Sequence, residues 1–487
     1  MSAKEAPMLL IRVCSTWRAV ALTSPLIWAR LHISFPGDPS VSSILGVTLS
    51  SAAIAKRHRI FSKVMQVRCQ VVKDWLTRSG TCPLSISFSY PIIGFMEVAD
   101  DFMGSRELLQ QLISFSHRWK HIVLFLPLSI YKKLESLISD DALPLPLLKS
   151  LECKIYWGQI VYPVLVPVRL LEAPNLQQLS LTSPPHLAQN PTILSHMWGR
   201  LTDLRIQSSI RDVSFYDIIK ICHNLVTCHV DSLDIYSDDF GSFQTEVVIP
   251  TLKMIRINES GGPSHAVRAI NAPNLKSLDY RFPSRFREHD PSTLMSADVL
   301  LGLVERGAST LRKLTLKPLV MRPEDTITCL RLANQLSHLV LRSPSSAYGL
   351  IEDRSLDSFN LDLLTIPNNS SPSVSQDILL PKLEVLEMNY ISQFTDERIL
   401  HLLTTRLDAA QRGEVAPLRR LKLHFARQMQ RDIKEEAFER AKSAGFELSL
   451  ELTYPADAPP YNGQLSPSFG LPICNSLEEV WPPVKNW

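Results

Sequence analysis

The sequence is poor in glycine and has no closely paired cysteines. It contains 17 glycines in 487 residues, about half of the ordinary share, and it lacks the glycine-rich phosphate-binding motifs, the GxSxG motif and the HExxH motif. Its eight cysteines include no CxxC pair, so neither a disulfide framework nor a zinc knuckle is expected. These absences predict a protein that is not an enzyme and that holds no metal or cofactor.

Long apolar runs are also missing. The apolar stretch at residues 8–13 is interrupted by Arg12 and is too short for a secretion signal, and no segment approaches the ~20 apolar residues of a membrane span. The net charge of +3 does not indicate a nucleic-acid-binding protein. We therefore expect a cytoplasmic or nuclear protein with reduced cysteines that binds neither membranes nor nucleic acids.

A basic cluster between residues 56 and 68 departs from this even balance of charge. Its members are Lys56, Arg57, Arg59, Lys63 and Arg68. Such a cluster would bind phosphate or serve as a nuclear import signal. The interpretation that we favour is a solvated helix face with Ile60, Val64 and Val67 on the opposite side, because no aromatic side chain accompanies the charges.

Leucine, by contrast, is abundant, with 72 residues, and much of it follows the pattern Leu-x-x-Leu-x-Leu. The pattern occurs at Leu176/Leu179/Leu181, Leu201/Leu204/Ile206, Leu311/Leu314/Leu316, Leu336/Leu339/Leu341 and Leu418/Leu421/Leu423. With apolar replacements it also fits Trp119/Ile122/Leu124, Leu148/Leu151/Cys153, Leu225/Cys228/Val230, Leu252/Ile255/Ile257, Leu275/Leu278/Tyr280, Leu383/Leu386/Met388 and, weakly, Leu356/Phe359/Leu361. Most starts are separated by the 20–29 residues that are typical of leucine-rich repeats.

The pattern predicts that each repeat consists of one strand followed by a helix. The last two apolar positions alternate with a polar residue, as in a strand with one buried face. Helical spacing follows at 297–306, 323–334 and 395–405, and a final helix at 431–444 precedes an alternating edge strand at 446–452. We expect an α/β fold, a leucine-rich-repeat-like solenoid with a curved parallel sheet and helices on its outer face. The alternative is an ordinary α/β sandwich, since the turn asparagine that follows the strand of standard repeats is mostly missing.

The N-terminal segment carries a second motif, Val13-Cys14-x-x-Trp17-Arg18-x-x-Ala21, followed by Ser24-Pro25-Leu26-x-Trp28. Further on come Trp75-Leu76-x-Arg78-Ser79-Gly80, then Ser116-His117-Arg118-Trp119, and Ala-Pro-Asn-Leu at 173–176 and 272–275. Over about residues 9–450 these segments resemble fungal F-box proteins with degenerate leucine-rich repeats. The N-terminal half of the F-box, with its Leu-Pro-x-Glu opening, is missing.

The resemblance implies a substrate-recognition subunit of an SCF-type cullin ubiquitin ligase, with the F-box on the Skp adaptor and the repeats on a protein target. The residues implied for the F-box fold or its adaptor face are Leu10, Val13, Trp17, Pro25, Leu26 and Trp28. The missing half leaves two interpretations open: the true start lies upstream of Met1, or the chain is a truncated relative of these F-box proteins. In the second case the chain would be a repeat-based interaction scaffold with no ligase role.

Side chains between the core leucines are expected on the concave face of the solenoid, where a target would bind. The candidates are Arg205, His229, Arg256, Asp279, Glu387 and Lys422. Their mixed signs favour no single charged ligand. The expected organisation is a partial F-box at 1–35, a helical linker at 36–80, a solenoid at 81–454 and a proline-containing tail at 455–487.

Overall fold

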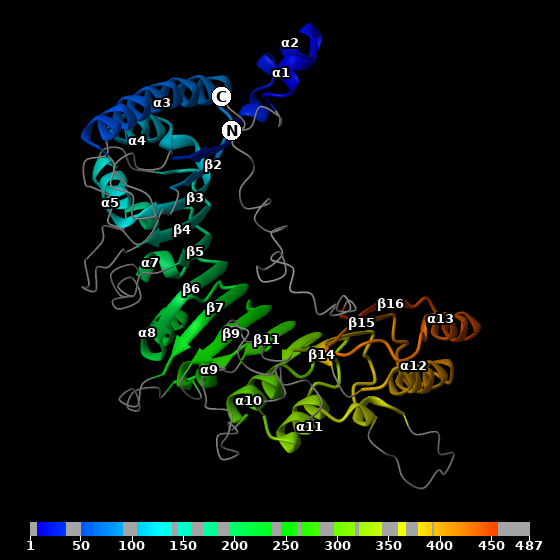
Figure 1. Ribbon diagram of the computed structural model, residues 1–487. Coiled ribbons are helices and arrows are strands. Elements are labelled where there is room, and N and C mark those ends of the chain that lie inside the picture. The colour runs from blue at the N-terminus through cyan, green and yellow to red at the C-terminus, as the bar shows by residue number, and fades with distance from the viewer. Residues whose placement is uncertain are drawn as a thin grey trace.

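In the described part of the chain, fourteen parallel strands follow one another in one curved sheet (Figure 1). The computed structural model describes residues 7–35, 50–90, 105–138, 145–156, 169–182, 195–235, 245–260, 264–281, 297–316, 321–342, 359–366, 378–391 and 394–455. The strands are β1 (Arg30–Ser34), β2 (Leu84–Ser89), β3 (Trp119–Pro127), β4 (Ser150–Tyr156), β5 (Gln178–Thr182), β6 (Asp203–Arg211), β7 (Thr227–Asp234), β9 (Met254–Ser260), β11 (Ser277–Arg281), β12 (Lys313–Leu316), β13 (His338–Leu341), β14 (Val385–Ile391), β15 (Arg420–Phe425) and β16 (Ser449–Thr453). The short strands β8 (Val247–Val248) and β10 (Ile270–Asn271) pair separately.

Helices occupy the connections and lie along the outer side of the arc, except for α1 and α2, which project from its N-terminal end (Figure 1). The α-helices are α1 (Leu10–Val13), α2 (Ser15–Thr23), α3 (Ser51–Arg78), α4 (Ser105–Ser114), α5 (Leu128–Leu137), α7 (Ser195–Trp198), α8 (Asp212–Ile221), α9 (His265–Ala269), α10 (Asp298–Gly307), α11 (Pro323–Leu332), α12 (Asp396–Gln411) and α13 (Lys434–Ser443). The 3-10 helices are η1 (Pro25–Trp28), η2 (Ser116–Arg118), η4 (Arg169–Glu172) and η10 (Leu361–Leu364).

The order of the strands in the sheet equals their order in the chain, as stacked repeats require. The predicted solenoid is therefore confirmed. The second apolar position of each repeat forms one continuous register row, namely Leu151, Leu179, Leu204, Cys228, Ile255, Leu278, Leu314, Leu339, Leu386 and Leu421. All of these side chains are buried, and each leucine or isoleucine contributes about 1.5–3 kcal/mol of hydrophobic stabilisation.

Side chains before the strands replace the turn asparagine of standard repeats. The amide Nδ2 of Asn175 donates to the Pro146 carbonyl (2.6 Å), that of Asn224 to Gly199 (2.9 Å) and that of Asn274 to Pro250 (2.9 Å). In each case the acceptor lies one repeat earlier, and Thr251 and Thr310 make similar bonds. The asparagines of the Ala-Pro-Asn-Leu motifs therefore join consecutive turns. They keep the repeats in register although the position after the strand mostly lacks the asparagine of standard repeats.

The sheet begins earlier than the expected boundary at residue 81. Strand β1 pairs with β2 in parallel from Arg30↔Ser85 to Ser34↔Ser89, and its alternating Leu31 and Ile33 are buried. The expected helical linker is thus the helix of the first repeat, with α3 connecting two neighbouring strands. The proline-containing tail lies outside the described residues beyond residue 455.

Two local expectations are wrong. In α3, Ile60 and Val67 are exposed (53% and 62%) on the side that carries Lys56 and Lys63, because helix positions three, four and seven apart share a face. The buried side consists of Phe61, Met65, Val72, Trp75 and Leu76. The weak repeat match ending at Phe359/Leu361 is not a strand, since Leu361 begins η10.

Buried Arg406 of α12 fixes that irregular segment. Its guanidinium donates to the carbonyls of Leu364 (2.8 Å), Leu379 (2.8 Å) and Leu380 (3.2 Å). Burial lowers the pKa of this arginine to about 10. This cationic side chain thus links α12 to backbone carbonyl groups at the end of η10 and before β14.

Candidate functional site

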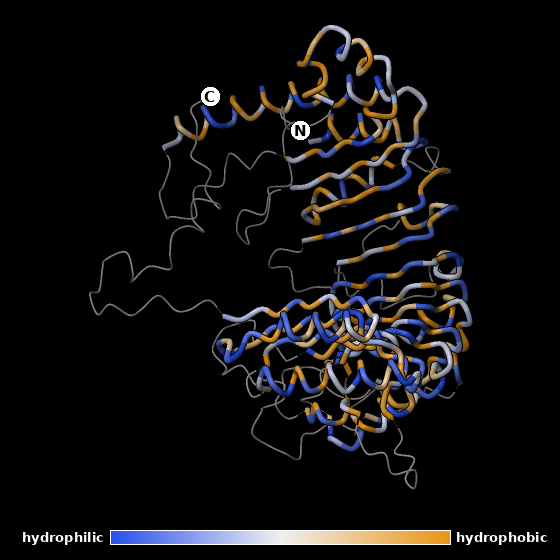
Figure 2. The backbone as a smooth tube through the Cα atoms, turned by 90° about the vertical axis from the view of Figure 1, so that its right-hand side faces the viewer, coloured by the Kyte–Doolittle hydropathy of each residue, from blue (hydrophilic) through white to orange (hydrophobic). Residues whose placement is uncertain are grey.

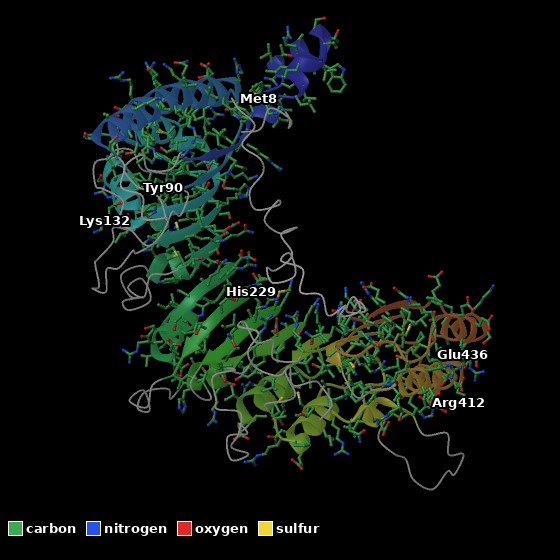
Figure 3. All side chains as sticks on the ribbon, viewed as in Figure 1. Met8, Tyr90, Lys132, His229, Arg412 and Glu436 are labelled. Carbon is green, nitrogen blue, oxygen red and sulfur yellow. The ribbon has the colours of Figure 1, made fainter. Side chains whose placement is uncertain are left out.

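The N-terminal apolar unit, defined here as α1, α2 and η1, is anchored by one tryptophan. Trp28 is fully buried, its indole Nε1 donates to the Ala21 carbonyl (2.7 Å), and its ring meets Trp75 of α3 edge-on at 4.9 Å between centroids. The Arg78 guanidinium lies 4.9 Å from the Trp28 centroid. These contacts fix the unit to the first repeat, although it projects from the arc (Figures 1 and 3).

The rest of this unit presents apolar side chains to solvent. Leu26 is 75% exposed, Val13 57% and Trp17 53%. Leu9, Val20 and Leu22 add further exposed apolar surface, and of the nine residues of α2 only Ala21 is buried. A solvent-facing tryptophan among exposed aliphatic side chains is typical of a binding surface.

The six residues implied by the F-box resemblance therefore separate into two groups. Val13, Trp17, Pro25 and Leu26 are exposed, and Leu10 is half-buried. Trp28 is a correction to the adaptor-facing set, because its contacts with Trp75 remove it from the surface. Sequence reasoning did not identify Leu9, Val20 and Leu22 as surface residues. The short apolar helices could have indicated them, because a helix of this length cannot bury apolar side chains on every face.

The segments around Trp75 and Arg118, which carry part of the F-box resemblance, have structural roles. Arg118 is 7% exposed and donates to the carbonyls of Leu76, Ser79 and Cys82 and to the Ser79 hydroxyl (2.6 Å). It therefore satisfies the C-terminal carbonyl groups of α3, where a positive charge also suits the helix dipole. Gly80 follows with φ +55°, the left-handed conformation that glycine adopts readily after a helix.

The central row, defined as one register line across the concave sheet, collects every candidate target-binding residue. It runs Ser180, Arg205, His229, Arg256, Asp279, Thr315, Val340, Glu387 and Lys422. The strand spacing of ~4.8 Å places these side chains in one line, and Figure 3 shows His229 on the strands that line the arc.

The middle of the row is an arginine-rich stretch around one buried carboxylate. Asp279 accepts hydrogen bonds from Arg256 Nε (2.8 Å) and from Arg281 Nε and NH2 (2.9 and 2.8 Å). Burial opposes ionisation of Asp279, but the hydrogen bonds and charges of these arginines hold its pKa below the ordinary value. The pKa of His229 is lowered by burial and by neighbouring Arg256 and Arg205. Asp279 is thus engaged, whereas Arg205 is exposed and its one side-chain hydrogen bond among the described residues is with His229 Nδ1 (3.4 Å).

Two charged residues in the C-terminal part of the row have partners within the protein. His338 Nε2 lies 3.1 Å from Glu387 Oε1, and Lys422 Nζ lies 3.0 Å from Glu451 Oε2. These partially exposed pairs contribute little to stability. To bind a target, the candidates Glu387 and Lys422 would have to give up their contacts with His338 and Glu451.

The buried ionisable groups serve the fold. Glu135 accepts bonds from the Tyr131 hydroxyl (2.7 Å) and the Arg169 amide (3.0 Å), and burial raises its pKa to about 7. Burial likewise raises the pKa of Glu259 to about 7, and its Oε1 accepts a bond from the Ser264 amide (2.9 Å). No three His, Cys, Asp or Glu side chains of the described residues come together as a metal site requires. No helix in the same part of the chain is both long and apolar enough to cross a membrane.

The fold defines the class as an α/β solenoid of the leucine-rich-repeat type. No family model matches the chain, and no curated protein matches it. Among solved structures the chain is similar to a chain in the crystal structure of the Rad7 and Elc1 complex in yeast, with 15% identity, 90% of this chain and 82% of that chain covered, and a TM-score of 0.33.

Proposed function

We propose that the protein is a non-catalytic recruiting subunit of an SCF-type ubiquitin ligase. In this role the N-terminal apolar unit binds a Skp-type adaptor, and the central row binds a protein target. The observation that carries the proposal is the exposed face of Val13, Trp17 and Leu26 on a unit that Trp28 fixes to the solenoid.

The energetics of that face support a docking role. Covering the exposed half of Trp17 removes about 100 Å² from water, worth ~2–3 kcal/mol at ~25 cal/mol per Å². Leu26 is three-quarters exposed and adds ~1–2 kcal/mol by the same reasoning. Because buried Trp28 holds the unit in place, a partner pays little ordering entropy when it binds.

The central row supports the second half of the proposal. A concave sheet gives an extended surface on which side chains of many strands contact one ligand at once. Arg205 is exposed and His229 is half-buried, and neither forms an ion pair with a carboxylate among the described residues. They are the side chains in this row best placed to meet a target.

Affinity capture of the co-expressed Skp-type adaptor tests the first half. The double variant Trp17→Ala/Leu26→Ala should retain at least tenfold less adaptor than the natural chain, with an unchanged thermal midpoint, since both side chains are exposed. The matched control is Met429→Ala/Phe438→Ala, which removes two apolar side chains of comparable exposure (53% and 43%) and should retain the adaptor fully.

Failure of the natural chain to retain the adaptor would refute the ligase role and favour the interaction scaffold. The target surface is tested separately with Arg205→Glu/His229→Gln, which leaves the Arg256–Asp279 pair intact, against the control Lys253→Glu/His223→Gln, which changes two exposed side chains of the same kinds outside the row. Quantitative mass spectrometry of co-purifying proteins should show partners lost only with the first variant. Equal losses with both variants would contradict the assignment of the central row.

A further inference from the structure

Helix α3 has a larger net positive charge than the complete chain. Its 28 residues include seven Lys or Arg and a single acid, Asp74, so its net charge is +6 against +3 for the complete protein. Figure 1 places this helix at the N-terminal end of the arc. The charge is therefore concentrated at one end of the molecule.

These charges are not neutralised within the described part of the chain. None of its ion pairs includes Lys56, Arg59 or Lys63. All three side chains are exposed, and Asp74 accepts its side-chain bond from Gln70 instead (2.8 Å). A face of this kind attracts an anionic partner at low ionic strength.

The same face also carries exposed aliphatic side chains. Lys56, Ile60, Lys63 and Val67 follow one another at intervals of four, three and four residues, which places them in one line along the helix over about 16 Å. Ile60 and Val67 are 53% and 62% exposed. They are one heptad apart, the interval at which one helix packs along another.

We infer that the outward face of α3, formed by Lys56, Arg59, Ile60, Lys63 and Val67, binds an acidic amphipathic helix of a partner protein. Aliphatic side chains between the cations gain nothing from a phosphate backbone, and the face has no aromatic ring on which bases could stack. It also lacks the Trp, Phe and Leu residues by which amphipathic helices insert into lipid. An acidic helix with one apolar residue per heptad matches both the charge and the spacing.

Fluorescence anisotropy with the full chain tests this inference. The probe is a labelled peptide of three heptads, each with one Leu and three Glu, and a second peptide carries Gln in place of every Glu. The acidic peptide should bind at low salt at least tenfold more tightly than its Gln version, and its affinity should fall as salt rises. Equal binding of both peptides, or no binding, would overturn the inference.

Charge and apolar variants separate the contributions. Lys56→Gln/Arg59→Gln/Lys63→Gln should weaken acidic-peptide binding at least tenfold, and Ile60→Ala/Val67→Ala should weaken it about fivefold. All five side chains are exposed, so these variants should keep the natural thermal midpoint.

A matched control removes the same charge elsewhere on the surface. Lys253, Lys276 and Arg419 are exposed residues of the turns before β9, β11 and β15, and their replacement by Gln should change acidic-peptide affinity less than twofold. An equal effect of the two triple variants would show non-specific attraction and overturn the inference. Tighter binding of a DNA duplex or of phosphatidylserine vesicles than of the peptide, unaffected by Ile60→Ala/Val67→Ala, would also overturn it.

Discussion

Replacing Asp396 by asparagine should destabilise the C-terminal end of the solenoid by about 3–5 kcal/mol. The Asp396 side chain is fully buried and accepts a bond from Arg427 NH2 (2.8 Å). It also accepts bonds from the amides of Gln430 (2.8 Å) and Arg431 (2.9 Å) and from the Tyr454 hydroxyl (2.9 Å). One carboxylate thus joins the start of α12, the loop after β15 and the end of the sheet.

The size of the effect follows from burial. Asparagine leaves the Arg427 side chain, which is only 12% exposed, without a counter-charge, and breaking one partner of a buried pair costs ~3–5 kcal/mol. The same chain offers a control at equal distance, since Arg440 NH2 lies 2.8 Å from Asp408 Oδ1 with side chains 50% and 27% exposed. Asp408→Asn should therefore cost less than ~1 kcal/mol.

Urea unfolding at pH 7, followed by circular dichroism and by hydrogen exchange of residues 420–455, measures both variants. Burial alone would raise the pKa of Asp396, but the bonds from Arg427, the two amides and Tyr454 hold it below the ordinary value. Its contribution is therefore complete above the unfolded pKa of ~3.9 and disappears as the pH falls through the lower folded value. The natural chain should lose its advantage over Asp396→Asn in that acidic range. Equal costs of the two substitutions at pH 7 would refute the argument from burial.

Two further predictions concern buried side chains, and an exposed residue of the central row serves as the control for the second. Burial raises the folded pKa of Glu135 and Glu259 to about 7, so the folded state binds more protons than the unfolded state between pH ~4.3 and 7, and stability should fall as the pH rises through that interval. Glu135→Gln/Glu259→Gln should flatten this slope, which for the natural chain amounts to up to about 3–4 kcal/mol of stability per site over the interval. Urea titrations at several pH values measure it, and an unchanged slope would contradict the prediction. Leu278→Asp should unfold the array, because a charge replaces a fully buried side chain between stacked strands, whereas Arg205→Ala should leave the thermal midpoint nearly unchanged in calorimetry.

Strong periodicity made most of the sheet predictable. Wherever the apolar triplet recurred at 20–29 residues, with the exception of the weak match before η10, the structure has a strand. Strand β1 escaped recognition because its partner β2 begins more than 50 residues later, across α3, and the repeat interval is lost. The alternation of Leu31 and Ile33 was the remaining signal.

The sequence predicted where the candidate surfaces lie, but not which of their side chains are free to bind a partner. Strand alternation placed the central row correctly, yet it could not show that Arg256 and Arg281 enclose Asp279. Spacing alone also could not decide which face of α3 is buried. Both faces carry apolar residues, and the larger Phe61, Met65 and Trp75 occupy the core side.

The sequential strand order has a mechanical consequence. Each strand of the main sheet pairs only with its neighbours in the sheet order, so among the described residues no strand pairing joins the two ends of the arc (Figure 2). A small rotation at every strand interface adds up along the sheet and opens or closes the arc without breaking any single contact. The distance between the N-terminal unit and the C-terminal strands should therefore change elastically when a force acts on these two ends.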